Sequence, residues 1–232
     1  MRSLRGSGGR RILWPRNLVV VSRSRMAVIS LVSLLATALL GLAVSRGYGE
    51  YGLERDALLL ISRPSNLDRW TQLADALAVP VMTAVFIASL VYGARRHVLP
   101  RVVVLALFAV VAELVSEKIA KPEVQERIHG ALSFPSGNVT AVCATAVAMW
   151  LALYPVLGKR ARLTTFWLGV TWTFLMSVAV VGAFWHTPID VVGSILLSVG
   201  SVTAGAAILG PGPASDPPSA GPLQPVQELE RV

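Results

Sequence analysis

Long apolar runs alternate with short polar stretches along most of this 232-residue chain. Six runs can be separated, at about 26–45, 73–93, 102–115, 139–156, 164–184 and 189–209. Most of them approach the roughly 20 residues that a helix needs to cross the hydrocarbon of a bilayer. The pattern therefore predicts an all-α, polytopic membrane protein built as a bundle of six transmembrane helices.

Composition supports a membrane protein and leaves no room for a sizeable soluble domain. Hydrophobic residues make up 54% of the chain and charged residues 15%, whereas about a quarter of the residues of a soluble domain are charged. The net charge is +8, but the basic residues lie beside the apolar runs, which suits contact with anionic lipid and predicts no nucleic-acid partner. The single cysteine, Cys143, lies inside an apolar run, so we expect packing and no disulfide.

The two ends of the chain differ from its middle. Residues 1–25 hold seven arginines and no acid, which predicts a disordered cytoplasmic arm at the lipid headgroups. Residues 210–232 hold six prolines and predict a disordered cytoplasmic tail. The membrane domain is expected to span 26–209, with its first run an uncleaved anchor because it is longer than a usual signal-peptide core. Residues 54–62 predict a short interfacial helix.

The distribution of basic residues predicts the orientation. If the N-terminus is cytoplasmic, the segments on the inner side hold 14 of the 21 Lys and Arg residues. This bias agrees with six spans and two cytoplasmic termini in an inner (plasma) membrane. The polar segment 116–138 and the turn at 185–188 then lie together on the outer face.

Each of two short polar segments, Ser133–Asn138 and Trp185–Asp190, precedes or begins an apolar run. In the first, the N–H groups of Ser136 and Gly137, the Ser136 hydroxyl and a helix N-terminus would form an anion site that suits phosphate. Gly137 would let the backbone approach the ligand closely. The alternative is a turn that only caps a helix.

The second segment offers a nucleophile. Thr187 is a good N-cap and Pro188 suits the first helical position, which places Asp190 in the first turn. The Asp190 carboxylate would then meet a ring nitrogen of His186, fix its tautomer and stabilise the imidazolium. Thr187 and Asp190 also fit an ordinary capping box, which is the purely structural alternative.

Basic side chains of the segment 116–138 are candidates for holding a phosphate. Arg127 would bind phosphate oxygens bidentately, Lys121 would act as a point charge, and Lys118 is a weaker candidate. Their alternative role is contact with lipid headgroups or ion pairs with the acids of the same segment, Glu117, Glu123 and Glu126.

Lys121, the turn Pro135-Ser136-Gly137 and the pair His186 and Asp190 resemble the three signatures of the phosphatidic acid phosphatase type 2 superfamily, over about residues 50–209. The resemblance implies a six-helix membrane fold and lipid phosphatase activity. It implies His186 as the nucleophile and Asp190 as its orienting partner, with the histidine of the second signature protonating the leaving group.

The signatures depart from that family at several positions. Asn138 stands where the family has its acid histidine, and Ala179-Val180 stands where it has Ser-Arg. The Arg-Pro that closes the first signature is missing. An amide cannot deliver a proton, so a diphosphate, whose leaving group needs a proton less, is expected to be preferred over a phosphomonoester. His129 could replace the missing acid, although a solvated loop histidine is the simpler interpretation.

The expected function is therefore metal-independent hydrolysis of a membrane lipid phosphate or diphosphate, a polyprenyl lipid among the options, through a phosphohistidine at the outer face. No cofactor and no metal site are expected, since no acidic cluster of metal-ligand type appears in the outer segments. The alternative is a catalytically impaired family member that binds lipid or assists an envelope-assembly partner. A transporter is less favoured because the runs lack paired charges or a repeat.

Overall fold

The computed structural model describes residues 22–47, 66–125, 127–128 and 131–210. Most of the basic arm, the expected interfacial helix at 54–62, His129 and nearly all of the proline-rich tail lie outside these residues. The predicted domain boundaries accordingly stay predictions.

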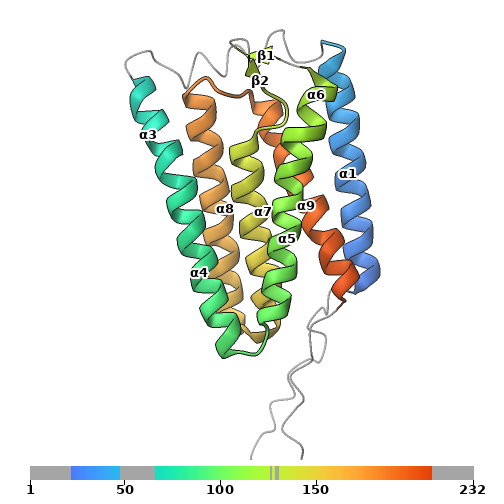
Figure 1. Ribbon diagram of the computed structural model, residues 1–232, viewed down its shortest axis with the longest axis vertical. Coiled ribbons are helices and arrows are strands. Elements are labelled where there is room, and N and C mark those ends of the chain that lie inside the picture. The colour runs from blue at the N-terminus through green and yellow to red at the C-terminus, as the bar shows by residue number, and fades with distance from the viewer. Residues whose placement is uncertain (1–21, 48–65, 126, 129–130, 211–232) are drawn as a thin grey trace, which may run out of the picture.

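The described residues form an all-helical bundle with six helices that are long and apolar enough to cross a membrane (Figure 1). The first, fifth and sixth spans are single helices: α1 (Arg23–Ser45), α8 (Lys159–Gly182) and α9 (Pro188–Leu209). The second span joins α3 (Leu67–Leu77) to α4 (Val79–Arg95), and the fourth joins α7 (Gly137–Leu153) to the 3₁₀ turn η3 (Tyr154–Val156). The third runs through α5 (Leu99–Val115), the π-turn η2 (Ser116–Ala120) and α6 (Lys121–Val124). The predicted six-helix membrane fold is confirmed.

The end of the third span differs from the prediction. We expected a polar connection from residue 116, but the chain stays helical to Val124 before the two-residue strands β1 (Arg127–Ile128) and β2 (Ala131–Leu132) form a small hairpin. A drop in hydropathy marks where a helix leaves the hydrocarbon, which need not be where the helix ends. Glu117 and Lys121 are four residues apart and form an ion pair, which favours continued helix.

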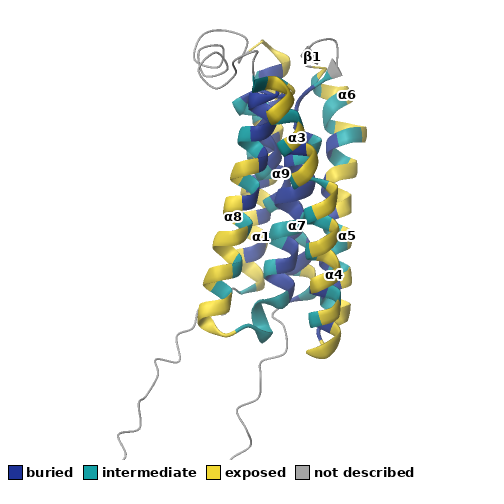
Figure 2. Cartoon of the chain, turned by 90° about the vertical axis from the view of Figure 1, so that its left-hand side faces the viewer, coloured by how far each residue is buried: buried dark blue, intermediate teal, exposed yellow. Residues whose placement is uncertain are grey.

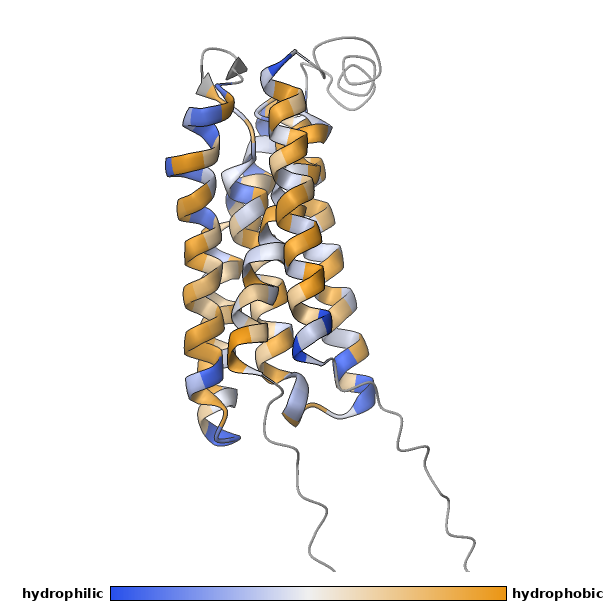
Figure 3. Cartoon of the chain, turned by 90° about the vertical axis from the view of Figure 1, so that its right-hand side faces the viewer, coloured by the Kyte–Doolittle hydropathy of each residue, from blue (hydrophilic) through white to orange (hydrophobic). Residues whose placement is uncertain are grey.

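Helix α1 shows the inverted polarity of a membrane helix. Its buried face carries small and polar residues, among them Ser30, Ser33 and Gly41, whereas Leu31 and Leu39 are more than half exposed. In lipid, small residues let helix backbones approach while large apolar residues face the acyl chains. Burial concentrates in the centre of the bundle (Figure 2), and hydropathic residues cover its sides while hydrophilic ones gather toward its ends (Figure 3).

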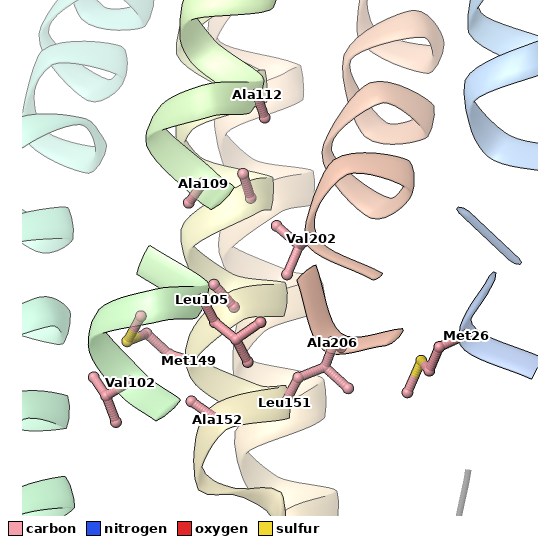
Figure 4. Close-up of a cluster of buried hydrophobic side chains, with 12 residues drawn as sticks. Met26, Val102, Leu105, Ala109, Ala112, Met149, Leu151, Ala152, Val202 and Ala206 are labelled. Atoms are coloured by element: carbon pink, nitrogen blue, oxygen red, sulfur yellow. The ribbon is translucent and has the colours of Figure 1, made fainter. Parts of the chain in front are cut away.

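Helix α9 packs against both α1 and α7 through small residues. Ser30 Oγ on α1 donates to the carbonyl of Gly200 at 2.8 Å, and Ser198 Oγ on α9 donates to the carbonyl of Thr140 on α7 at 3.0 Å. The half of the bundle nearer the start of α1 is filled by an apolar cluster from α1, α5, α7 and α9, which includes Met26 and Leu105 (Figure 4). The polar groups of interest therefore belong to the other end.

We predict that Gly200→Leu destabilises the bundle. A Cβ at Gly200 would lie 2.8 Å from Leu34 Cγ on α1, so a larger side chain must push α1 and α9 apart. Overpacking of this kind costs about 1–3 kcal/mol, which should lower the melting temperature of the protein in detergent. Ile208→Phe adds volume to the same helix at a position that is 70% exposed and serves as the control. Equal melting temperatures for both variants would contradict this packing.

Candidate functional site

The turn that leads into α7 is a buried helix cap. Ser136 is the N-cap residue, with its side chain accepting from the Val139 N–H at 3.5 Å, and it is fully buried. The alternative that this turn caps a helix is thus present in the structure. A cap and an anion site are compatible, because the first N–H groups of a helix have no intrahelical acceptor.

Phe134 anchors this turn between two helices. Its ring lies against Gly41 of α1 and Gly193 of α9, so a Cβ on either glycine would come within 3.1 Å and 2.5 Å of the ring. Phe134 is 1% exposed, and the peptide bond to Pro135 is cis. Glycine is needed at 193 because the aromatic ring occupies the space that any side chain would take.

The second polar segment forms the turn between α8 and α9. Thr187 is the N-cap of α9, its Oγ1 accepts from the Asp190 N–H at 3.3 Å, and Asp190 Oδ2 accepts from the Thr187 N–H at 2.9 Å. Pro188 occupies the first turn. The capping box that the sequence allowed is therefore formed.

The same carboxylate also meets the candidate nucleophile. His186 Nδ1 lies 3.4 Å from Asp190 Oδ2, the His186 residue is 8% exposed and Asp190 is 0% exposed. Nδ1 and Asp190 Oδ1 make no hydrogen bond within the described part of the chain. Contacts between catalytic groups are often long without substrate, and a proton on Nδ1 facing Asp190 would leave Nε2 as the nucleophilic nitrogen.

The two turns lie at the same end of the bundle. Ser194, one helical turn after Asp190, donates from Oγ to the carbonyl of Ser136 at 3.0 Å and to the carbonyl of Asp190 at 2.6 Å. Figure 1 shows the start of α9, the start of α7 and α6 together at the upper end, opposite the start of α1. An imidazole and an amide-rich helix N-terminus are thus brought together by one serine hydroxyl.

An ion pair from the extended third span completes this end. Lys121 Nζ lies 2.6 Å from Glu117 Oε1, and the Lys121 side chain is 14% exposed. A Cβ at Gly137 would collide with Glu117 Oε1 and would lie 3.7 Å from Lys121 Nζ. Lys121 therefore stands at the first residue of α7, whereas Lys118 is exposed.

Glu117 is the residue that sequence reasoning missed, since we treated it only as a possible counter-ion. Its spacing of four residues from Lys121 was the available signal, because that spacing places both on one helix face. The contact of Glu117 with Gly137 is tertiary and had no signal in the sequence.

Other predicted residues are placed less closely or not at all. Asn138 is the second residue of α7 and is partly buried. Arg127 lies in β1, but its side chain lies outside the described part of the structure. Val180, which stands where the family has an arginine, is fully buried in an apolar cluster with Trp172 and Met176, so it supplies no phosphate contact.

Two more polar atoms near this end are buried and lack partners among the described residues. They are Ser133 Oγ, in the turn before α7, and Trp70 Nε1 on α3. The Trp70 ring lies against Gly182, the last residue of α8, where a Cβ would come within 2.7 Å. In the described ranges, no group of three or more His, Cys, Asp or Glu residues gathers as a metal site would require.

Comparison with known proteins places this arrangement in a family. Residues 113–210 match the PAP2 superfamily, and this span includes Glu117, Lys121, both turns and α7 to α9. No curated protein and no solved structure matches the chain. Through residues 113–210 the chain belongs to the PAP2 superfamily, which implies an activity of the phosphatase type.

Proposed function

We propose that this protein hydrolyses a membrane lipid phosphate or diphosphate through a phosphohistidine on His186. The observation that carries the proposal is the meeting of His186 and Asp190 with the Ser136-Gly137 turn, joined by the Ser194 hydroxyl. Lys121 at the first residue of α7 adds the positive charge that a phosphate needs.

The chemistry divides among these groups. The Lys121 ammonium and the N-terminus of α7 hold the phosphate oxygens, with Ser136 and Gly137 supplying the turn and Arg127 a further cation. His186 Nε2 attacks phosphorus while Asp190 stabilises the imidazolium that forms. Water then releases phosphate from His186. Positive charge for the transition state comes from the chain's own groups, so the proposal requires neither a metal nor another cofactor.

An apolar groove beside the site supports a lipid substrate. Helices α8 and α9 both pack on α7, and between them runs a groove of about 820 Å³ lined by residues such as Gly169, Pro188 and Ile195. It extends along α9 from Pro188 to Thr203, which is roughly 22 Å of helix. Its upper end lies two residues from His186, so a hydrocarbon tail in the groove would leave its phosphate at the site.

The same proposal assigns the site to the outer face. The bias of Lys and Arg toward 1–25, 94–101 and 157–163 supports cytoplasmic termini, and the bundle places both turns at the end opposite the start of α1. The substrate would thus be a lipid of the outer leaflet of the plasma membrane. Residues 1–25 and 210–232 are assigned to a cytoplasmic arm and tail around the 26–209 domain.

Two positions favour a second candidate function. Asn138 replaces the family's acid and the buried Val180 replaces its arginine. A protein without these groups would bind a lipid phosphate but turn it over poorly, and would act as a lipid-binding or envelope-assembly partner.

We predict that His186→Ala abolishes phosphate release from lipid phosphates, by roughly 10⁴-fold or more because the nucleophile is lost. Purified protein in detergent is assayed against a panel of lipid phosphates and diphosphates, and radiolabelled substrate should leave acid-labile label on the wild type only. His97→Asn is the control, since His97 is exposed, lies at the other end of the bundle and has a φ of 58°, which asparagine tolerates.

Asp190→Asn separates orientation from capping. Asparagine also caps helices well, so the melting temperature should stay near that of the wild type while turnover falls by about 10²–10⁴-fold. Undiminished turnover in Asp190→Asn, or phosphate release that survives His186→Ala, would contradict the assigned roles. A wild type that binds lipid phosphate without hydrolysing it would favour the second candidate function.

Removal of divalent metal is predicted to leave the activity unchanged. Dialysis against EDTA followed by assay in metal-free buffer tests this, because Lys121 and the α7 N-terminus are proposed to supply the positive charge. Activity that disappears in EDTA and returns with added Mg²⁺ would overturn the metal-independent mechanism.

The groove is predicted to hold the substrate's hydrocarbon tail. Val192 lines it and is 49% exposed, so Val192→Trp should fill the groove without disturbing the helix core. The KM for a long-chain phosphatidic acid should rise about fivefold, equivalent to roughly 1 kcal/mol, while a dibutanoyl analogue should be unaffected. Ile208→Trp, on the same helix outside the groove, is the matched control. An equal effect on both chain lengths would argue against tail binding there.

A further inference from the structure

Asn138 leaves the proposed reaction without its expected proton donor. Departure of an alkoxide from a phosphomonoester needs a proton, and an amide has none to give. Departure of a phosphate group needs a proton much less, because its second pKa is about 6. Asn138 considered alone therefore restricts the protein to diphosphates.

The structure places a carboxyl group at this point from another element. Glu117 extends from η2 so that Oε1 occupies the position that a Cβ of Gly137 would take, one residue before Asn138. Its side chain is 39% exposed, so the carboxylate is accessible from the site. Ser116, its neighbour in η2, donates from Oγ to the carbonyl of Pro135 at 3.4 Å, which ties η2 to the turn.

The other acids of the site are less suited to this task. Asp190 is fully buried and already accepts the Thr187 N–H. Glu113 lies one helical turn earlier on α5 and is exposed. Among the residues that the structure describes, Glu117 is the acid in contact with the N-terminus of α7.

We propose that Glu117 is the general acid and base of the reaction, in place of the histidine that Asn138 replaces. This assignment rests on the proposed function of His186. The nucleophile comes from the start of α9 and the acid from η2, and the two elements meet at the start of α7, where the phosphate would lie.

The contact with Lys121 explains how Glu117 changes role when substrate binds. Without substrate, the Glu117 carboxylate is the anion paired with Lys121 at 2.6 Å. A bound phosphate takes over Lys121, and two anions then face each other. A phosphomonoester is partly monoanionic near neutral pH, since its second pKa is about 6. Such a substrate brings a proton that Glu117 can accept and pass on.

The proton balance closes over one turnover. His186 Nε2 forms a bond to phosphorus as the bond from phosphorus to the leaving oxygen breaks, and Glu117 gives its proton to that oxygen. Glu117, now a carboxylate, takes a proton from water as the water oxygen attacks phosphohistidine. The phosphorus–nitrogen bond breaks, phosphate leaves, and Glu117 is protonated again.

A matched pair of substrates tests this role. Farnesyl phosphate and farnesyl diphosphate share a tail but differ in leaving group, so kcat/KM is measured for both with full-length wild type, Glu117→Gln and Glu123→Gln. Glutamine keeps an acceptor for Lys121 but cannot donate as an acid. Glu117→Gln is expected to lower kcat/KM about 10²-fold or more for the phosphate and less than about tenfold for the diphosphate. Glu123→Gln removes the same charge from the exposed side of α6 and should change neither value.

The outcomes separate this inference from the function on which it rests. A wild type inactive on both substrates, or active independently of His186, overturns the phosphatase proposal and the role of Glu117 with it. If activity depends on His186, an equal loss on both substrates in Glu117→Gln refutes the acid role and leaves the phosphatase standing. An unchanged or increased kcat/KM for farnesyl phosphate refutes it as well, because Glu117 would then only occupy the phosphate position.

Discussion

Two serine hydroxyls on α9 set the relation between α9 and α7, and the site depends on that relation. Ser194 Oγ donates to the carbonyl of Ser136 and Ser198 Oγ to the carbonyl of Thr140, each at 3.0 Å. The hydrophobic effect does not drive helices together in lipid, so such hydrogen bonds and close packing do, at about 0.6–2 kcal/mol each. Because both bonds link residues 58 apart, they hold the start of α9 level with the start of α7.

The groups at this end serve structure and proposed chemistry together. Asp190 caps α9 through the Thr187 N–H and lies beside His186 with the same oxygen. Ser136 caps α7 while its carbonyl receives Ser194. A carboxylate fixed by a helix cap is already oriented, so little ordering remains to be done when a substrate arrives. The structural and functional interpretations of these residues therefore do not compete.

The bundle separates a polar end from an apolar half. The cluster around Met26 and Leu105 fills the space between the helices away from the site, while buried polar atoms such as Ser133 Oγ, Trp70 Nε1 and Asp190 Oδ1 lack partners near it. Unpaired buried polar atoms are costly and rare, and they are retained where another ligand uses them. Their position beside an apolar groove fits a substrate with a charged head and a hydrocarbon tail.

The sequence determined the six spans and the caps of α7 and α9, because span length and capping depend on residues close together along the chain. Ser136 and Thr187 could be identified as N-caps from their neighbours, and the shared end of the two turns followed from counting spans. The sequence also identified His186, Asp190 and Lys121 as candidates for the chemistry, since their residue types and spacing are local features.

Only the tertiary structure decided which groups face each other. The helical continuation through Ser116 to Val124, the contact of Glu117 with Gly137, the burial of Val180 and the groove between α8 and α9 all depend on how helix faces pack. Neither hydropathy nor spacing encodes the rotation of one helix relative to another. That rotation is set by contacts such as those of Gly193 with Phe134 and Gly200 with Leu34, between residues that are far apart in sequence.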